Sequence, residues 1–233
     1  MKKAPLIKAA ILIIYLLGLS SCSSDDAAIV EDNGITTGNY FPLITNNKWW
    51  YTNNGEVSLV YVGYTNNFEG IPYYRINDDG SDFNIPQWML KKGASYYQKS
   101  GEVLMPLEGG ATLEIGEYEI KMFRDDLSVG ATWSGSTPLH VIVYNNGAHQ
   151  KLPASLTYTG TILERDASET LNDVTYTNII KMQLHAVETV NSQVTNIEAE
   201  YWFAKDIGLI RESVTSSTDN VTKTRTLTSH ELN

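Results

Sequence analysis

The chain has 233 residues, with 27 acidic and 17 basic side chains, for a net charge of −10. This acidic balance argues against nucleic acid as a partner, because nucleic acids select basic surfaces. Its length fits one β domain, or two small ones, once a leader and a linker are set aside. Cys22 is the single cysteine, which excludes an internal disulfide.

The N-terminus has the pattern of an export signal. Lysines occupy positions 2, 3 and 8, and an apolar run follows over residues 9–19. That run is well short of the roughly 20 residues that a membrane-spanning helix needs. A basic start, a short apolar centre and small residues at the end are typical of a secretory signal. We expect residues 1–21 to be this signal.

The signal ends in the sequence Leu19-Ser20-Ser21-Cys22. This sequence resembles the lipobox of bacterial lipoproteins, in which the cysteine is acylated and becomes the first residue after cleavage. The resemblance implies that Cys22 is lipidated and that the membrane is a partner of the mature chain. Several acyl chains hold a protein firmly where one does not. The alternative is a short membrane helix with an incidental cysteine.

An acidic flank follows the cysteine: Ser23, Ser24, Asp25 and Asp26. It resembles the export signal of surface-exposed lipoproteins of the Bacteroidota. That resemblance implies an outer-membrane lipoprotein exposed at the cell surface. If the flank is instead an ordinary polar linker, the protein faces the periplasm. Residues 22–38 are small, acidic and without periodicity, so we expect the lipidated cysteine to begin a flexible linker.

Residues 39–233 read as one β-rich domain. Asn or Asp precedes Gly at 53–55, 78–80 and 145–147, and each triplet lies between strand-like runs. Such pairs tolerate the positive φ angles of hairpin turns. Apolar and polar residues alternate over 179–187 and 197–203, the pattern of long strands with one buried face. The predicted fold is all-β and antiparallel: a curved meander, a half-barrel or a sandwich.

Two segments carry a resemblance to a family. Tyr40-Phe41-Pro42-Leu43 leading to Trp49, and the segment YWFAKDIGLI at 201–210, are similar to elements of uncharacterised β-rich lipoproteins of the Bacteroidota. The resemblance implies a role in the cell envelope. It carries no catalytic residues to this chain.

The sequence contains no recognised catalytic, metal or cofactor motif. His140, His149, His185 and His230 have no metal-ligand spacing. The acidic segment that starts at Asp78 lacks the glycine that a calcium loop needs at its sixth position. A hairpin turn is therefore the preferred interpretation of that segment. We predict no catalytic residues, no metal and no cofactor, and an enzyme is the less favoured class.

Aromatic residues are the remaining functional signal. Adjacent aromatics occur at 49–51, 73–74 and 96–97, and neighbours on a strand point to opposite faces. A second aromatic face can stack sugars, line an apolar cavity or pack on another sheet. Trp202, beside Glu198 and Glu200, is the candidate for an exposed ligand contact.

The favoured function is a non-catalytic binding or interaction module for a glycan, an apolar ligand or a protein partner. The alternatives are a structural envelope component without a small ligand and, less favoured, a glycan-active hydrolase. A one-sided cavity in a curved sheet would favour a carrier. A filled core with a flat polar surface would favour the structural role.

Overall fold

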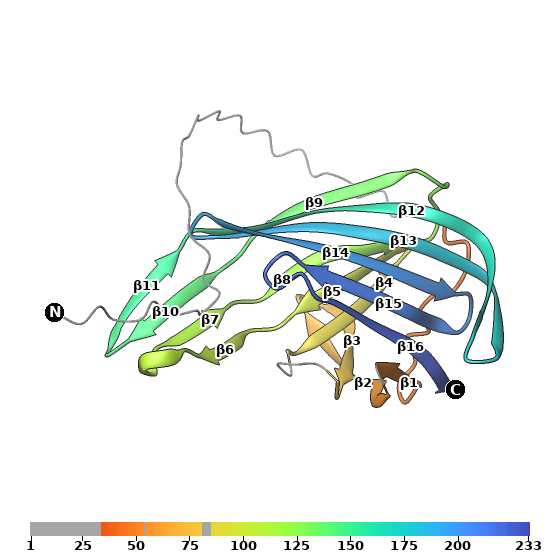
Figure 1. Cartoon of the computed structure of the whole chain (residues 1–233), viewed down its shortest axis with the longest axis horizontal. Coiled ribbons are helices and arrows are strands. Elements are labelled where there is room, and N and C mark those ends of the chain that lie inside the picture. The colour runs from red at the N-terminus through yellow and green to blue at the C-terminus, as the bar shows by residue number, and fades with distance from the viewer. Residues whose placement is uncertain (1–33, 54, 81–84) are drawn as a thin grey trace.

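The computed structural model describes residues 34–53, 55–80 and 85–233. Within these residues the protein is all-β and antiparallel, which confirms the predicted fold class. Twelve strands form one strongly curved sheet that nearly closes into a barrel, and four form a smaller sheet at one end of it (Figure 1). In the described residues no helix is long and apolar enough to cross a membrane.

Most neighbouring strands of the large sheet are consecutive in the sequence and are joined by hairpins. Its order is β8 (Tyr118–Arg124), β5 (Ser95–Ser100), β4 (Gln87–Lys92), β3 (Ile71–Asp78), β2 (Glu56–Phe68), β1 (Lys48–Asn53), β16 (Thr222–Glu231), β15 (Gly208–Ser216), β14 (Gln193–Ala204), β13 (Val174–Val190), β12 (Ala154–Leu171) and β9 (Thr132–Pro138). The small sheet has the order β11 (Ala148–Leu152), β10 (Val141–Asn145), β7 (Thr112–Ile115) and β6 (Val103–Pro106), and a short 3-10 turn, η1 (Glu108–Gly110), joins β6 to β7.

The predicted turn at 145–147 joins β10 to β11. Asn146 and Gly147 have φ angles of 48° and 81°. Both central residues of a type I′ turn need positive φ, and Asn and Gly reach it at little cost. The triplet at 53–55 likewise lies between β1 and β2, and Asp78 ends β3. Local turn chemistry therefore sets the hairpin at 145–147. Residue 54 is not among the described residues, and neither Asp79 nor Gly80 has a positive φ angle, so the type I′ geometry expected at 78–80 is not found.

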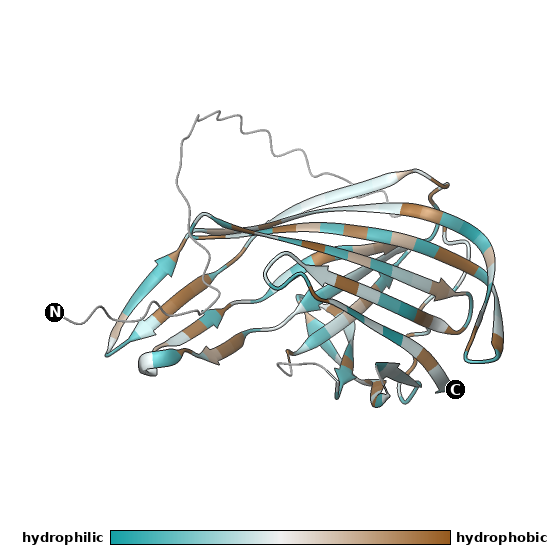
Figure 2. Cartoon of the chain, viewed as in Figure 1, coloured by the Kyte–Doolittle hydropathy of each residue, from teal (hydrophilic) through white to brown (hydrophobic). Residues whose placement is uncertain are grey.

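The long β12–β13 hairpin wraps one end of the barrel (Figure 1). Alternate residues of β13, including Ile180, Met182 and Leu184, are buried, as predicted, and Figure 2 shows the resulting apolar and polar bands. At its tip, Asn172 Nδ2 donates to the Leu227 carbonyl of β16 at 2.9 Å. We call this end of the barrel the closed end and the opposite end the open end.

Side chains, and not backbone pairing, join the two edge strands β8 and β9. Trp133 Nε1 donates to the Lys121 carbonyl at 2.8 Å, and the Lys121 amide donates to Tyr158 Oη at 2.8 Å. Both rings lie over glycines of the neighbouring strand: a Cβ on Gly160 would meet Trp133 at 2.1 Å, and one on Gly135 would meet Tyr158 Oη at 2.3 Å. These glycines leave the space that lets the rings cross to β8.

The small sheet lies at the open end, where β8 and β9 separate. β7 leads directly into β8 and β9 leads directly into β10, so the small sheet grows out of both edges of the large one. The Gly116 amide donates to the His140 carbonyl at 2.7 Å and ties the two connections together. The small sheet therefore covers the opening between β8 and β9 that lies beyond the side chains joining these two strands.

Candidate functional site

A cavity of about 830 Å³ lies inside the barrel. Its lining is mixed. Val60, Ile76, Met89 and Val214, which come from four different strands, form an apolar part, and polar side chains such as Gln87 and Gln98 form the rest. Inward-pointing side chains of a narrow barrel normally fill its interior. Here they leave a space in the size range of small-molecule binding sites.

Aromatic packing at the closed end forms the floor of the cavity. Phe41 lines the floor and packs on Trp49, with ring centroids 5.0 Å apart. Trp49 Nε1 donates to the Ile207 carbonyl at 2.7 Å, and Phe123 stacks on Phe203 at 4.7 Å. The floor therefore belongs to the core and is closed by well-packed rings.

An arginine with two carboxylate partners lies near the mouth. Arg225 Nη1 donates to Asp78 Oδ2 at 2.5 Å, Arg225 Nε donates to Glu212 Oε2, and the guanidinium lies 5.0 Å from the ring centre of Tyr51. Burial by itself lowers the pKa of Arg225, but the carboxylates of Glu212 and Asp78 more than offset this, so its pKa is raised. Burial also raises the pKa of Tyr51 and Tyr201. Arg225 therefore stays cationic, and the two phenols stay neutral.

The mouth carries more acid than base. Glu56, Asp79, Asp78 and Glu212 line it, against Lys223 and Arg225. A concave site with net negative charge repels carboxylates and phosphates and attracts cations. In the part of the chain that the structure describes, no group of three or more His, Cys, Asp or Glu side chains is arranged to hold a metal ion. The chemistry of the mouth therefore suits neutral or cationic polar groups.

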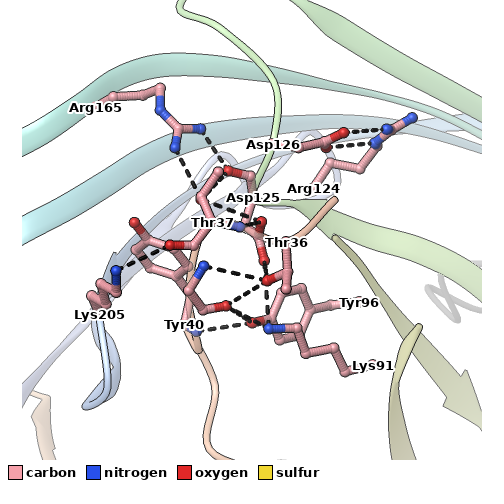
Figure 3. A network of polar contacts seen from close by, with 11 residues as sticks. Thr36, Thr37, Tyr40, Lys91, Tyr96, Arg124, Asp125, Asp126, Arg165 and Lys205 are labelled. Carbon is pink, nitrogen blue, oxygen red and sulfur yellow. Dashed lines mark hydrogen bonds and ion pairs between the residues drawn. The ribbon is translucent and has the colours of Figure 1, made fainter. Parts of the chain in front are cut away.

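The segment that precedes β1 docks on the closed end, around Asp125 (Figure 3). The Asp125 side chain is fully buried and accepts hydrogen bonds from Thr36 Oγ1 and the Thr37 amide, both at 2.7 Å. Lys91 Nζ lies 3.6 Å from the same carboxylate. Burial lowers the pKa of Lys91, and Asp125 partly offsets this.

Two more cations hold the same segment. Arg165 Nη2 donates to Thr37 Oγ1 at 3.1 Å, and Lys205 Nζ donates to the Thr37 carbonyl at 3.0 Å. The sequence assigns residues 36–38 to a flexible linker, but Thr36 and Thr37 are hydrogen-bonded to the domain. The linker therefore enters the fold at the closed end, opposite the cavity mouth.

Trp202 lies on the outer face of β14 and is not the exposed side chain that the sequence suggested. Only 9% of it is exposed. Lys181 and Arg211 each lie 4.5 Å from its ring, and its indole donates to Glu200 Oε1 at 2.5 Å. Glu198 is also on this outer face, next to His185. The expectation of an exposed indole is wrong, because long cationic stems from both neighbouring strands cover it. A ligand contact by these residues stays a prediction.

The lipidation residue Cys22 and the flank Ser23–Asp26 lie outside the described residues. The acidic segment at 78–80 is described and has a structural role: Asp78 binds Arg225, and Asp79 Oδ1 accepts from the Leu59 amide at 2.5 Å. This fits the predicted hairpin turn. The polar groups of the mouth went unrecognised in the sequence because Arg225 is 147 positions from Asp78.

The comparisons with known proteins concern the fold. A predicted lipoprotein from Parabacteroides distasonis is 11% identical, with a TM-score of 0.47, over 84% of this chain and 99% of that chain. A predicted exported protein with a YmcC-like fold from Bacteroides fragilis is 10% identical, with a TM-score of 0.42, over 82% and 98%. The hypothetical lipoprotein YmcC from Escherichia coli is 11% identical, with a TM-score of 0.37, over 82% and 87%.

No protein-family model matches the chain, and no curated protein matches it. All three similar structures are of lipoproteins or exported proteins, and two of them come from Parabacteroides and Bacteroides. At these identities the likeness is one of fold alone.

Proposed function

We propose that this protein is a non-catalytic binding module of the cell envelope that holds the apolar part of an amphipathic ligand inside the barrel. The observation that carries the proposal is the cavity of about 830 Å³, with a partly apolar wall, a closed aromatic floor and a charged mouth. Burying apolar surface contributes about 25 cal/mol per Å², so such a wall favours an apolar occupant. A structural component with a filled core would not need this space.

The chemistry of the cavity favours one of the three ligand classes that the sequence left open. A glycan has hydroxyl groups along its whole length. Gln87 and Gln98 could bind some of them, but the apolar part of the wall, with Val60, Ile76 and Met89, offers no hydrogen bonds to the others. A protein partner needs a wide surface, not an interior space. An apolar ligand with a neutral or cationic polar group fits both the walls and the net negative mouth.

We also propose that a lipid on Cys22 attaches the protein to the outer membrane and that Ser23–Asp26 direct it to the cell surface, the alternative being a protein that faces the periplasm. Entry of the linker at the closed end supports a mouth that stays accessible when the chain is anchored. Cys22→Ser should release the protein from membrane fractions. Deleting residues 23–26 should reduce its cleavage by external protease without releasing it. Unchanged fractionation or unchanged cleavage would contradict the respective assignment.

Ligand binding can be tested with N-phenyl-1-naphthylamine, a neutral apolar fluorophore whose emission rises in an apolar site. The protein is purified as Cys22→Ser, so that no detergent competes for the probe. Val60→Trp places a large ring in the cavity and should weaken probe binding at least tenfold. Tyr61→Trp is the matched control, because Tyr61 is the next residue on β2 and is 38% exposed. It should leave binding unchanged.

A second cavity variant, Val214→Trp, is included in case the Val60→Trp protein does not fold. Thermal unfolding of each variant shows whether it is folded. Absence of saturable probe binding in the parent protein would refute the proposal, and so would equal affinity in folded Val60→Trp and Tyr61→Trp proteins. Native mass spectrometry of the protein from its host then identifies the bound molecule.

A further inference from the structure

A second cavity, of about 280 Å³, lies between the small sheet and the open end of the large sheet. Met105, Leu113, Ile115 and Val141 of the small sheet form one apolar wall. The opposite wall comes from the ends of β13 and β14, where they join in a hairpin. The volume equals that of roughly nine waters at about 30 Å³ each, so it suits a small molecule or one end of a larger one.

The β13–β14 register places polar residues on this second wall. Glu188 pairs with Thr195 and Val190 pairs with Gln193. Residues two apart on a strand share a face, and directly paired residues share it too. Glu188, Val190, Gln193 and Thr195 therefore all project into the cavity, which agrees with its lining.

Two hydrogen-bond acceptors in this cavity lack partners. Gln193 Oε1 is buried and has no hydrogen bond within the described chain. Glu188 has no hydrogen-bond or ion-pair partner among the described residues, and burial raises its pKa. Glu188 is also the one charged side chain among the described residues that line the cavity. Buried polar groups are nearly always paired in native proteins. Two acceptors without a partner among the described residues, in a cavity whose lining is about half apolar, therefore favour a ligand that carries a hydrogen-bond donor.

We propose that this cavity is a binding site for a primary ammonium group carried on a short apolar stem. An ammonium has three donors and a positive charge, so one group can satisfy both Glu188 and Gln193. A neutral hydroxyl has one donor, and a carboxylate or phosphate would be repelled by Glu188. The stem would pack on Met105, Leu113 and Val141. This site adjoins the barrel cavity at Ile197, which lines both, but its polar groups are its own and its occupation does not depend on the proposed function.

The test is calorimetric titration of the Cys22→Ser protein with n-butylammonium, 1-butanol and butyrate, which share one stem length. Butylammonium should bind at least tenfold more tightly than butanol, and butyrate should not bind. Glu188→Gln keeps the shape and removes the charge, and it should weaken butylammonium binding at least tenfold. Gln193→Leu should weaken it severalfold. Glu198→Gln, on the outer face of β14, is the control and should leave it unchanged.

The barrel variant Val60→Trp separates this site from the first cavity. It should abolish binding of N-phenyl-1-naphthylamine and leave butylammonium affinity unchanged, whereas Glu188→Gln should do the reverse. Butanol affinity within threefold of butylammonium affinity would overturn the proposal. So would unchanged affinity in a folded Glu188→Gln protein, or the absence of butylammonium binding.

Discussion

Two carboxylates at opposite ends of the large sheet, Asp125, which is buried, and Glu188, which is half-buried, have opposite surroundings. Asp125, at the closed end, accepts two hydrogen bonds at 2.7 Å from Thr36 and Thr37 and lies 3.6 Å from Lys91 Nζ. Glu188, at the open end, has no partner within the described residues, and burial raises its pKa. This difference separates a structural end of the sheet from the end that we propose for binding. The closed end uses its charges internally to hold the linker and the floor, and the open end leaves charge available to a ligand.

The largest effect should come from breaking the closed end with Asp125→Ala. The substitution leaves Lys91 partly buried without its counter-charge and releases Thr36 and Thr37. Breaking a buried pair from one side costs about 3 kcal/mol. We expect the free energy of unfolding to fall by that amount in urea denaturation.

Asp126→Ala is the matched control at the next position. Asp126 pairs with Arg124 at 2.6 Å and lies against Gly34, but it does not bind the hydroxyl of Thr36 or the amide of Thr37, which Asp125 accepts. Its loss should cost about 1 kcal/mol or less. Equal losses in the two variants would mean that Asp125 does not organise the closed end.

The seam between β8 and β9 should be the next most sensitive feature. Gly160→Ala adds a Cβ at the place where the Trp133 ring lies 2.1 Å away, so the ring must move from the Lys121 carbonyl. Overpacking of this kind costs about 2 kcal/mol. Gly63→Ala is the control, because its Cβ meets only the end of the Asn77 side chain. Similar thermal unfolding of both variants would show that the seam does not support the barrel.

At the open end, Glu188→Gln should stabilise the protein in a pH-dependent way. The folded-state pKa of Glu188 is raised above its unfolded value, so the folded state loses stability as pH rises through that pKa. Glu188→Gln has no carboxyl group to ionise, so it does not lose this stability as pH rises. We expect it to be about 1 kcal/mol more stable than the parent at pH 7. The advantage should disappear by about pH 3, where the carboxyl is protonated in both states.

Urea denaturation at the two pH values measures this difference. Asp125→Asn is the opposing case at the closed end, because it removes a paired carboxylate and should destabilise at pH 7. A Glu188→Gln protein that is less stable than the parent at pH 7 would show that Glu188 has a favourable partner.

The smallest effect on binding should follow Trp202→Phe, on the outer wall. The change removes the hydrogen bond to Glu200 Oε1 and keeps a ring between Lys181 and Arg211. Loss of one such bond costs about 1 kcal/mol of stability. Affinity for N-phenyl-1-naphthylamine should not change, because the ring points away from the cavity. A tenfold loss of affinity would return Trp202 to the role of ligand contact.

Much of the fold follows from local patterns. The Asn–Gly pair at 146–147 predicts its hairpin because its residues tolerate positive φ. Alternation over 179–187 predicts which face of β13 is buried, since side chains on a strand alternate with a period of two. Alternation does not show whether neighbouring side chains cover a residue on the outer face. Trp202 was therefore expected to be exposed.

The cavity mouth and the closed end depend on contacts between distant parts of the chain. Arg225 meets Asp78 across 147 positions, and Thr37 meets Asp125 across 88. The sequence assigned the segment at Asp78 to a hairpin turn and indicated no partner for either acid. The signal for Glu188 was weaker still, because an isolated Glu near a strand end is normally a solvated surface residue.

The sequence alone determined the signal-like leader, the predicted lipidation of Cys22, the hairpins and the all-β class, because each depends on residues close together in the chain. Only the tertiary structure decided that the sheet curls into a nearly closed barrel with one filled end and one hollow end. The curvature depends on how the twelve strands pack. It also depends on Gly135 and Gly160, which leave space for the rings of Tyr158 and Trp133. The position of Glu188, a carboxylate without a partner among the described residues, in the second cavity depends on that curvature.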